Sequence, residues 1–350
     1  MARFTENRWT SAIIPALLIH IPIGTVYCWS VFKQLIADRL NASPASVEWG
    51  FSLAIFFLGM SAAFAGPMVC FVVGFAGTGV SIALNFLPGV FICYGAIMGI
   101  GLGVGYLTPV KNLMLWFSDN KGLATGIAVA GFGLAKAIAS PLMEYLIGTV
   151  GLVNMFFILA VIYAVMMFFG FLLIKRPADW VYDPATSHVS RAEILRKPVF
   201  WGIWIAFYIN ITCGLALISQ EKDILHDVLK AFPQYAGLSP AKFAAAIAGI
   251  IGLVLAVDSV FNTAGRVGFS TLSDHLKRRE TVYQVIFIMS IAVCLLQIFT
   301  NSINNALLWA VLAMLFLINA GYGGGFSTLP KCCSTSTSAP RPSPPRTVSR

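Results

Sequence analysis

The sequence predicts an all-α, polytopic membrane protein of about ten transmembrane helices arranged as two halves. Three observations support this prediction. The 350 residues are 58% hydrophobic and only 11% charged, whereas soluble domains are about a quarter charged. Apolar runs of spanning length follow one another along the chain. The motif GVGYLTPVK at the end of the predicted fourth span recurs as GGGFSTLPK at the end of the last one.

The number of spans follows from the charge pattern. The stretch 49–110 contains no Asp, Glu, Lys, Arg or His, and it is too long for one helix of roughly 20 residues. Cation-rich short loops stay in the cytoplasm, so we place the N-terminus, 111–122, 175–198 and 273–280 there. An odd number of spans must then lie within 49–110, and three fit. The predicted helices lie near residues 10–33, 49–69, 70–86, 88–110, 123–147, 152–174, 199–219, 246–272, 281–300 and 304–329.

The repeat predicts a unit of six helices. Residues 1–174 form one such half, the polar, basic segment 175–198 is a linker, and 199–330 hold only four helices. We therefore expect an incomplete second half that lacks its last two helices. The Ser/Pro/Arg-rich residues 331–350 are predicted to be disordered, either as a natural polar tail or as the result of truncation. Near residue 70 the first half lacks a counterpart of SDHLKRR, which indicates a deletion or a tight Gly/Pro turn.

Composition and motifs exclude several classes. The net charge of +9 comes from short clusters between apolar spans, so we expect no nucleic-acid partner. The seven cysteines show no ligand spacing, so no metal site or cofactor is predicted. No Ser/His/Asp or Cys/His constellation is present, and we predict no catalytic residue and no enzyme. The expected partners are the lipid bilayer and a small solute, for a monomer in the plasma membrane.

An ionisable side chain inside a span has to face a cavity or a partner, because its burial in lipid costs ~3 kcal/mol or more. Asp258, Asn262 and Arg266 are four residues apart and therefore share one helix face. A guanidinium binds carboxylates through two parallel hydrogen bonds. Arg266 and Asn262 are therefore candidates for binding an anionic substrate. The alternatives are that Arg266 snorkels to the cytoplasmic surface or braces Asp274.

Two further ionisable residues lie within predicted spans. Lys136 is near the middle of the fifth helix, either as a second substrate-binding cation or as the partner of Asp258. Such a pair either couples protons to transport or is a static ion pair. His20 titrates in the physiological range when unperturbed, so it is either a proton-coupling residue or a satisfied core histidine.

Four aromatic residues are candidates for an aromatic cage around a small organic anion. A tyrosine offers a hydroxyl donor and an apolar wall in one side chain. For each residue, ordinary helix packing is an equal alternative. The four are Tyr27, Trp29, Tyr106 and Tyr322.

Several segments resemble a known family. They are GTVYCWSVF (24–32), VEWGFSLAIFFLGMSAAFAGP (47–67), GLATGIAVAGFGLAKAIASPL (122–142) and FNTAGRVGFSTLSDHLKRRETVY (261–283). They are similar to the major facilitator superfamily and, more narrowly, to its oxalate/formate antiporter family. The monocarboxylate transporters are the next nearest family. The resemblance implies a fold of two six-helix halves, the second of them incomplete in this sequence.

The resemblance also implies a function. It indicates a secondary active transporter of small organic anions such as oxalate, formate or lactate, working by alternating access as an antiporter or a proton symporter. Arg266 matches the arginine of the family's eighth helix that binds the substrate's carboxylate. Asp274, Arg278 and Arg279 match the family's cytoplasmic loop motif. The alternatives are a membrane sensor or receptor on the same fold, or a truncated, non-functional transporter product.

Overall fold

The computed structural model describes residues 7–63, 69–117, 121–177, 193, 195–276, 281–299 and 305–336. These residues form helices and short turns, with no strand among them. The α-helices are α1 (Ile14–Gly24), α2 (Trp29–Arg39), α3 (Pro44–Ala63), α4 (Val69–Ala83), α5 (Leu87–Val90), α6 (Gly99–Trp116), α7 (Lys121–Val150), α8 (Leu152–Leu173), α10 (Pro198–Lys230), α11 (Pro240–His275), α12 (Thr281–Phe299) and α13 (Asn305–Ser336). The π- and 3₁₀-helices are η2 (Trp9–Ile13), η3 (Thr25–Cys28), η4 (Phe91–Met98) and η6 (Pro233–Tyr235).

Eight helices in the described ranges are long and apolar enough to cross a membrane. Between the first two of them lie α3, with 20 residues, and the shorter apolar helix α4, with 15. Large apolar side chains on the outer faces remain exposed, such as Phe168 and Phe171 of α8 and Ile288 and Ile291 of α12. Lipid chains cover such faces without cost, because they are as apolar as the side chains. The predicted all-α, polytopic membrane fold is confirmed.

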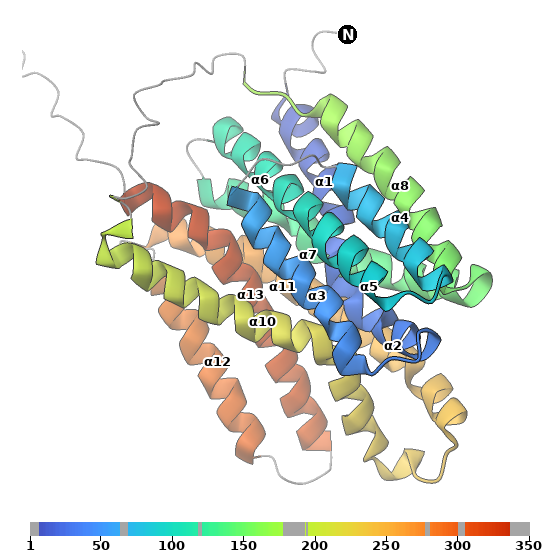
Figure 1. Ribbon diagram of the computed structural model, residues 1–350. Coiled ribbons are helices and arrows are strands. Elements are labelled where there is room, and N and C mark those ends of the chain that lie inside the picture. The colour runs from blue at the N-terminus through green and yellow to red at the C-terminus, as the bar shows by residue number, and fades with distance from the viewer. Residues whose placement is uncertain are drawn as a thin grey trace, which may run out of the picture.

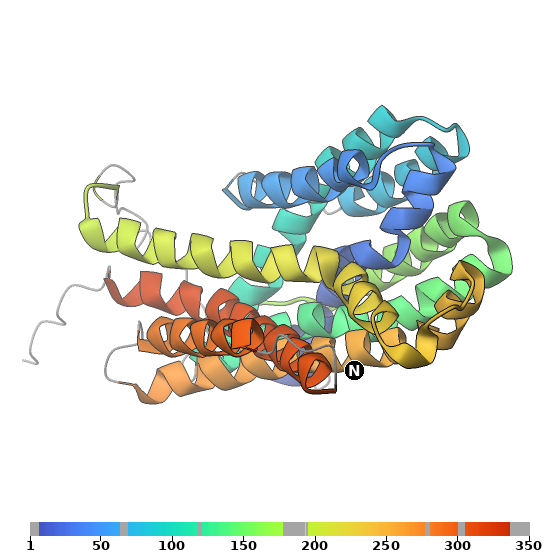
Figure 2. The ribbon, with the colours of Figure 1, turned by 90° about the horizontal axis from the view of Figure 1, so that it is seen from below.

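The helices form two bundles. Figure 1 shows α1 to α8 (blue to green) on one side of α10 and α12 (orange) on the other, while α13 (red) crosses α10 in this view. Figure 2, seen from below, shows the long helix α10 (yellow-green) running between α3 (blue) on one side and α12 and α13 (orange and red) on the other. The main contact between the bundles is α7 against α11, supported by α2 against α10 and α7 against α13. Residues at these contacts therefore lie between the halves.

The first spanning segment is not a uniform helix. It runs from Trp9 to Arg39, and the 3₁₀-helix η3 interrupts it between α1 and α2. At Gly24 the backbone lies directly against the Phe132 carbonyl of α7, where even one added carbon would clash. A 3₁₀ stretch inside a long helix often marks a functional position, and here it contains Tyr27.

Two helices are longer than their apolar runs. The sequence predicts the end of the seventh helix near residue 219 and a mixed-charge loop after it, but α10 continues to Lys230. The extension is amphipathic, and its buried residues Leu225 and Leu229 pack with Phe243 and Ile247 of α11. Packing of this apolar stripe explains the extra turns. Similarly, α13 extends to Ser336, into the predicted tail. Residues 64–68, 178–192 and 337–350 lie outside the described residues.

Candidate functional site between the two halves

The polar face of α11 points into the protein. Asp258, Asn262 and Arg266 are 1%, 3% and 0% exposed, which rules out the alternative that Arg266 snorkels to a surface. Arg266 Nε donates to Asn262 Oδ1 at 2.8 Å, and Arg266 Nη2 donates to the Tyr27 hydroxyl at 3.0 Å. Arg266 Nη1 is buried and donates to no described group. A buried donor without an acceptor is costly, so this nitrogen is available to an acceptor that enters the site.

Aromatic rings surround the guanidinium. The Arg266 carbon Cζ lies 5.4 Å from the ring centre of Phe132, 5.9 Å from that of Tyr322 and 5.4 Å from that of Phe326. These distances are within the range of cation–π attraction. The hydroxyls of Tyr27 and Tyr322 are hydrogen-bonded at 2.5 Å. Because Tyr27 belongs to the first half and Tyr322 to α13, this bond joins the two halves beside Arg266.

A cavity of about 400 Å³ adjoins this cluster. Four of its lining residues also contact Arg266: Tyr27 by a hydrogen bond, and Phe132, Tyr322 and Phe326 through their rings. The rest of the wall is mainly aliphatic, from η3, α3, α6 and α10. Arg266 itself is not part of the lining. The cavity is therefore an apolar chamber with the cation just behind its aromatic wall.

The predicted aromatic cage is present only in part. Tyr27, Tyr106 and Tyr322 line the cavity, but Trp29 does not. The Trp29 ring packs against Phe32, Phe51 and Tyr94 in the first half, and its Nε1 donates to Glu48 at 3.2 Å. Trp29 lies at the start of α2, beyond the η3 break, so it faces away from Tyr27. Trp29 therefore lies outside the candidate site.

The sequence analysis missed three aromatic rings that line the cavity: Phe132, Phe207 and Phe326. The signal for Phe326 was in the repeat, because it occupies the position in GGGFSTLPK that Tyr106 occupies in GVGYLTPVK. The two rings in fact meet, with centroids 5.0 Å apart. Nothing in the local sequence marks Phe132, which lies in a Gly- and Ala-rich helix.

A second buried cluster is centred on Lys136. Its Nζ donates to Glu221 Oε2 of α10 and lies 3.7 Å from Asp258 Oδ2 of α11. The three side chains are at most 2% exposed. Glu221 was not predicted as a site residue, because it lies beyond the apolar run of its helix. Its Oε1 is buried and accepts no hydrogen bond from the described residues.

Asparagine side chains connect the two clusters. Asn319 Nδ2 of α13 donates to Asp258 Oδ1 at 2.7 Å, and Asn262 Nδ2 donates to the Asn319 carbonyl at 3.2 Å. Asn262 also accepts the bond from Arg266. Polar contacts thus lead from Arg266 through the Asn262 side chain to the Asn319 backbone carbonyl, and from the Asn319 side chain to Asp258.

The structure places His20 in the packing beside Tyr106. Its Nδ1 contacts the Ala128 carbonyl, and its Nε2 lies 3.1 Å from the Tyr106 carbonyl. Its ring packs on Tyr106 and Phe132. Both ring nitrogens face acceptors, and a neutral imidazole donates from only one of them. His20 packs behind two residues of the cavity wall, and its described contacts do not include the Lys136 cluster. Its role in proton coupling stays a prediction.

A third cluster is centred on Lys33, in the middle of α2. Lys33 Nζ is 2.7 Å from Asp223 Oδ2 of α10 and 3.5 Å from Glu48 Oε2 of α3, and it donates to Gln220 Oε1 at 3.2 Å. The Lys33 side chain is 4% exposed, but Asp223 is 52% exposed. This cluster also joins the halves, and sequence reasoning did not anticipate it.

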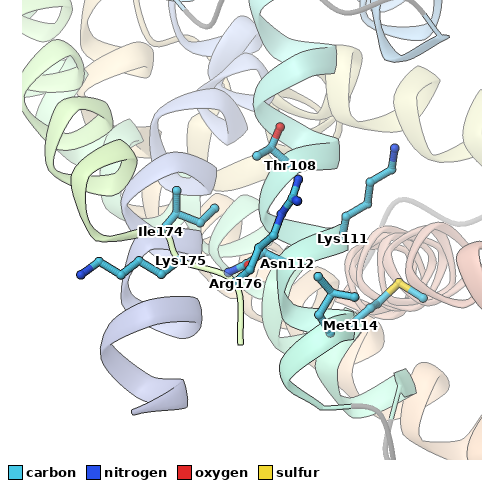
Figure 3. Close-up of a pocket in the computed structure, with 8 residues that line it drawn as sticks. Thr108, Lys111, Asn112, Met114, Ile174, Lys175 and Arg176 are labelled. Carbon is cyan, nitrogen blue, oxygen red and sulfur yellow. The ribbon is translucent and has the colours of Figure 1, made fainter. Parts of the chain in front are cut away.

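A basic pocket lies at the opposite end of the first half. It has a volume of about 610 Å³, and Figure 3 shows Arg176 reaching along α6 toward Thr108 while Lys175 points away. Trp116 Nε1 donates to the Lys175 carbonyl at 2.9 Å, and the Lys175 amide donates to the Ser11 carbonyl at 3.2 Å. The start of the first span and the ends of α6 and α8 therefore lie together at this end of the protein. The charge pattern predicts that these three segments lie on the same side of the membrane. Of the predicted loop motif, Asp274 lies in the last turn of α11, and Arg278 and Arg279 fall outside the described residues.

These features define a class of protein. A multi-pass helical fold with charged residues and a cavity between two bundles is that of a membrane transporter. The chain belongs to the Major Facilitator Superfamily, whose sequence profile matches residues 17–343. It is thus a multi-pass integral membrane protein of a transporter family.

Individual relatives agree with this assignment. The chain is 26% identical to the uncharacterized MFS-type transporter YhjX of Escherichia coli, over 95% of this chain and 81% of that one. It is 24% identical to the oxalate:formate antiporter of Oxalobacter formigenes, over 93% of this chain and 76% of that one. The apicoplast pyruvate carrier 1 of Toxoplasma gondii is 24% identical over 61% of this chain and 46% of its own length. The fold matches the proton:xylose symporter XylE with a TM-score of 0.60 at 13% identity, covering 91% of this chain and 79% of that one.

Proposed function

We propose that this protein is a secondary active transporter of small organic anions, namely mono- or dicarboxylates such as oxalate, formate or lactate. Transport proceeds by alternating access, as antiport or proton symport, and we place the protein in the plasma membrane. The observation that supports this most strongly is the fully buried Arg266, whose Nη1 has no acceptor among the described residues and whose surroundings are aromatic. Two relatives named for carrying oxalate, formate or pyruvate support the same substrate class.

The chemistry of the site fits a small carboxylate. A guanidinium presents parallel N–H groups that match the two oxygens of a carboxylate. The aromatic wall excludes water, which strengthens the charge–charge attraction. Because Arg266 lies behind the lining, the Tyr27–Tyr322 hydrogen bond has to open before a carboxylate replaces Tyr27 as the partner of Nη2. The tyrosine hydroxyls then become further donors to the substrate.

The test is direct binding to purified, folded protein. We expect oxalate, formate or lactate to bind the parent protein, and Arg266→Gln to lose this binding without unfolding. Arg39→Gln is the matched control, because Arg39 is exposed at the end of α2 and should leave affinity unchanged. Calorimetry gives the affinity, and uptake into proteoliposomes shows whether binding leads to transport. If Arg266→Gln binds carboxylates as tightly as the parent, Arg266 is structural and the proposal fails.

A further inference from the structure

The charges buried between the halves are balanced before any substrate enters. In the described part of the chain, the buried charged residues are Lys33, Lys136, Glu221, Asp258 and Arg266. Lys33 is matched by the partly exposed Glu48 and Asp223. The remaining four comprise two cations and two carboxylates. An anion that binds Arg266 therefore leaves one negative charge without a partner in a region from which water is excluded, which is strongly unfavourable.

One proton would restore this balance, and the geometry indicates where it binds. Both carboxylate oxygens of Asp258 are engaged, Oδ1 by Asn319 at 2.7 Å and Oδ2 by Lys136 at 3.7 Å. Glu221 uses only Oε2, which faces Lys136, while its Oε1 is buried with no donor. A buried carboxylate oxygen that accepts no hydrogen bond is poorly stabilised as an anion, so a proton binds there more readily than at an oxygen that already has a donor.

We propose that Glu221 is the proton-binding residue of this protein and that it takes up one proton for each monocarboxylate bound at Arg266. This inference rests on the proposed function and selects proton symport for monoanions. In the step, a hydronium ion transfers its proton to Glu221 Oε1, an O–H bond forms and a water molecule is left. The reverse transfer to water on the other side of the membrane releases the proton. Lys136 then retains Asp258 as its charged partner.

The groups around Glu221 support this assignment. Lys136 faces it from α7 and Asp258 from α11, and Asn319 of α13 binds Asp258. On its own helix, the adjacent Gln220 turns to Lys33. The path through Asn319 and Asn262 to Arg266 carries the effect of the anion to the carboxylates. Glu221 does not contact the anion site directly. It is connected to Arg266 through Lys136, Asp258 and the two asparagines, so it can respond to the charge of a bound anion.

The test measures proton uptake when an anion binds. Lactate is added to purified protein in weakly buffered solution with a pH indicator, and calorimetry gives the bound amount. We expect the parent to take up one proton per lactate, and its affinity to fall about tenfold per pH unit in the alkaline range, as linkage requires. Glu221→Gln imitates the protonated form, so it should still bind lactate but take up no proton and lose the pH dependence. Glu144→Gln, an exposed carboxylate on α7, should behave like the parent.

Each outcome decides the question. Lactate binding to the parent without proton uptake overturns this inference but leaves the proposed function intact, and it needs no variant that has to fold. Proton uptake that survives in Glu221→Gln but disappears in Asp258→Asn or His20→Gln assigns the proton elsewhere and also overturns it. If the parent binds none of the carboxylates, both the proposed function and this inference fail.

Discussion

Two lysines of the first half hold acids of α10, but their surroundings differ. Lys136 binds Glu221, and both side chains are at most 2% exposed. Lys33 binds Asp223, which is 52% exposed. Glu221 and Asp223 are two residues apart and therefore point roughly 200° apart around the helix. Helix α10 thus presents one acid to the core and the other to the edge of the interface.

The difference in exposure gives the same kind of ion pair two different roles. A buried pair is costly to break, because the remaining charge has no water to solvate it. A pair with a solvated partner contributes little to stability and is weakened by salt. We expect the Lys136–Glu221 pair to be strong and costly to break while both groups are charged, and the Lys33–Asp223 pair to be a weak contact that breaks readily.

The largest effect is expected for Lys136→Met. The substitution leaves Glu221 and Asp258 buried without a cation, so the free energy of unfolding should fall by about 3–5 kcal/mol. The loss should shrink as the pH is lowered, because protonated carboxyls no longer need a cation. Thermal unfolding in detergent at several pH values measures both effects. Lys242→Met, at an exposed position of α11, is the control, and an equal loss in both variants would disprove the special role of Lys136.

The next effect concerns substrate binding by Arg266. Arg266→Lys keeps the positive charge but removes the two parallel N–H donors, so carboxylate affinity should weaken by about 1.5–3 kcal/mol. Arg39→Lys should leave the affinity unchanged. Calorimetric titration with oxalate or lactate measures the difference. Unchanged affinity in Arg266→Lys would show that charge alone attracts the anion and that guanidinium geometry plays no part.

The two lysine clusters also show which parts of the site could be predicted from the sequence and which could not. The spacing of Asp258, Asn262 and Arg266 predicted one polar face of a helix, and the structure shows all three buried. The partners of these residues depend on which helices pack together, and no local pattern contains that information. The apolar run ends near residue 219, so the sequence predicted that Glu221 lies in a loop. In the structure helix α10 continues to Lys230 and includes it. Trp29 is only two residues from Tyr27 in the sequence, but it lies beyond η3 and does not line the cavity.

A smaller effect is expected from the hydrogen bond that joins the halves beside Arg266. Tyr322→Phe removes one hydroxyl, but the Tyr27 hydroxyl still accepts from Arg266. The free energy of unfolding should therefore fall by only about 0.5–1.5 kcal/mol. Tyr145→Phe, at an exposed tyrosine of α7, is the matched control. If Tyr322→Phe destabilises the protein as much as Lys136→Met, the tyrosine bond is a principal link between the halves and does not open readily for a substrate.

The smallest effect is expected at Lys33 and Asp223. Asp223→Asn removes one partner of Lys33 but leaves Glu48, Gln220 and the Ser219 carbonyl in place. Since Asp223 is half exposed, the coupling between the two charges should be only about 0.2–1 kcal/mol and should decline with added salt. A double-mutant cycle of Lys33→Met and Asp223→Asn, measured by thermal unfolding at low and high salt, gives this coupling. The same cycle on Lys136 and Glu221 should give a larger value with little salt dependence. Equal couplings at the two sites would mean that solvent exposure does not weaken the Lys33–Asp223 pair and that it is as strong as the buried Lys136–Glu221 pair.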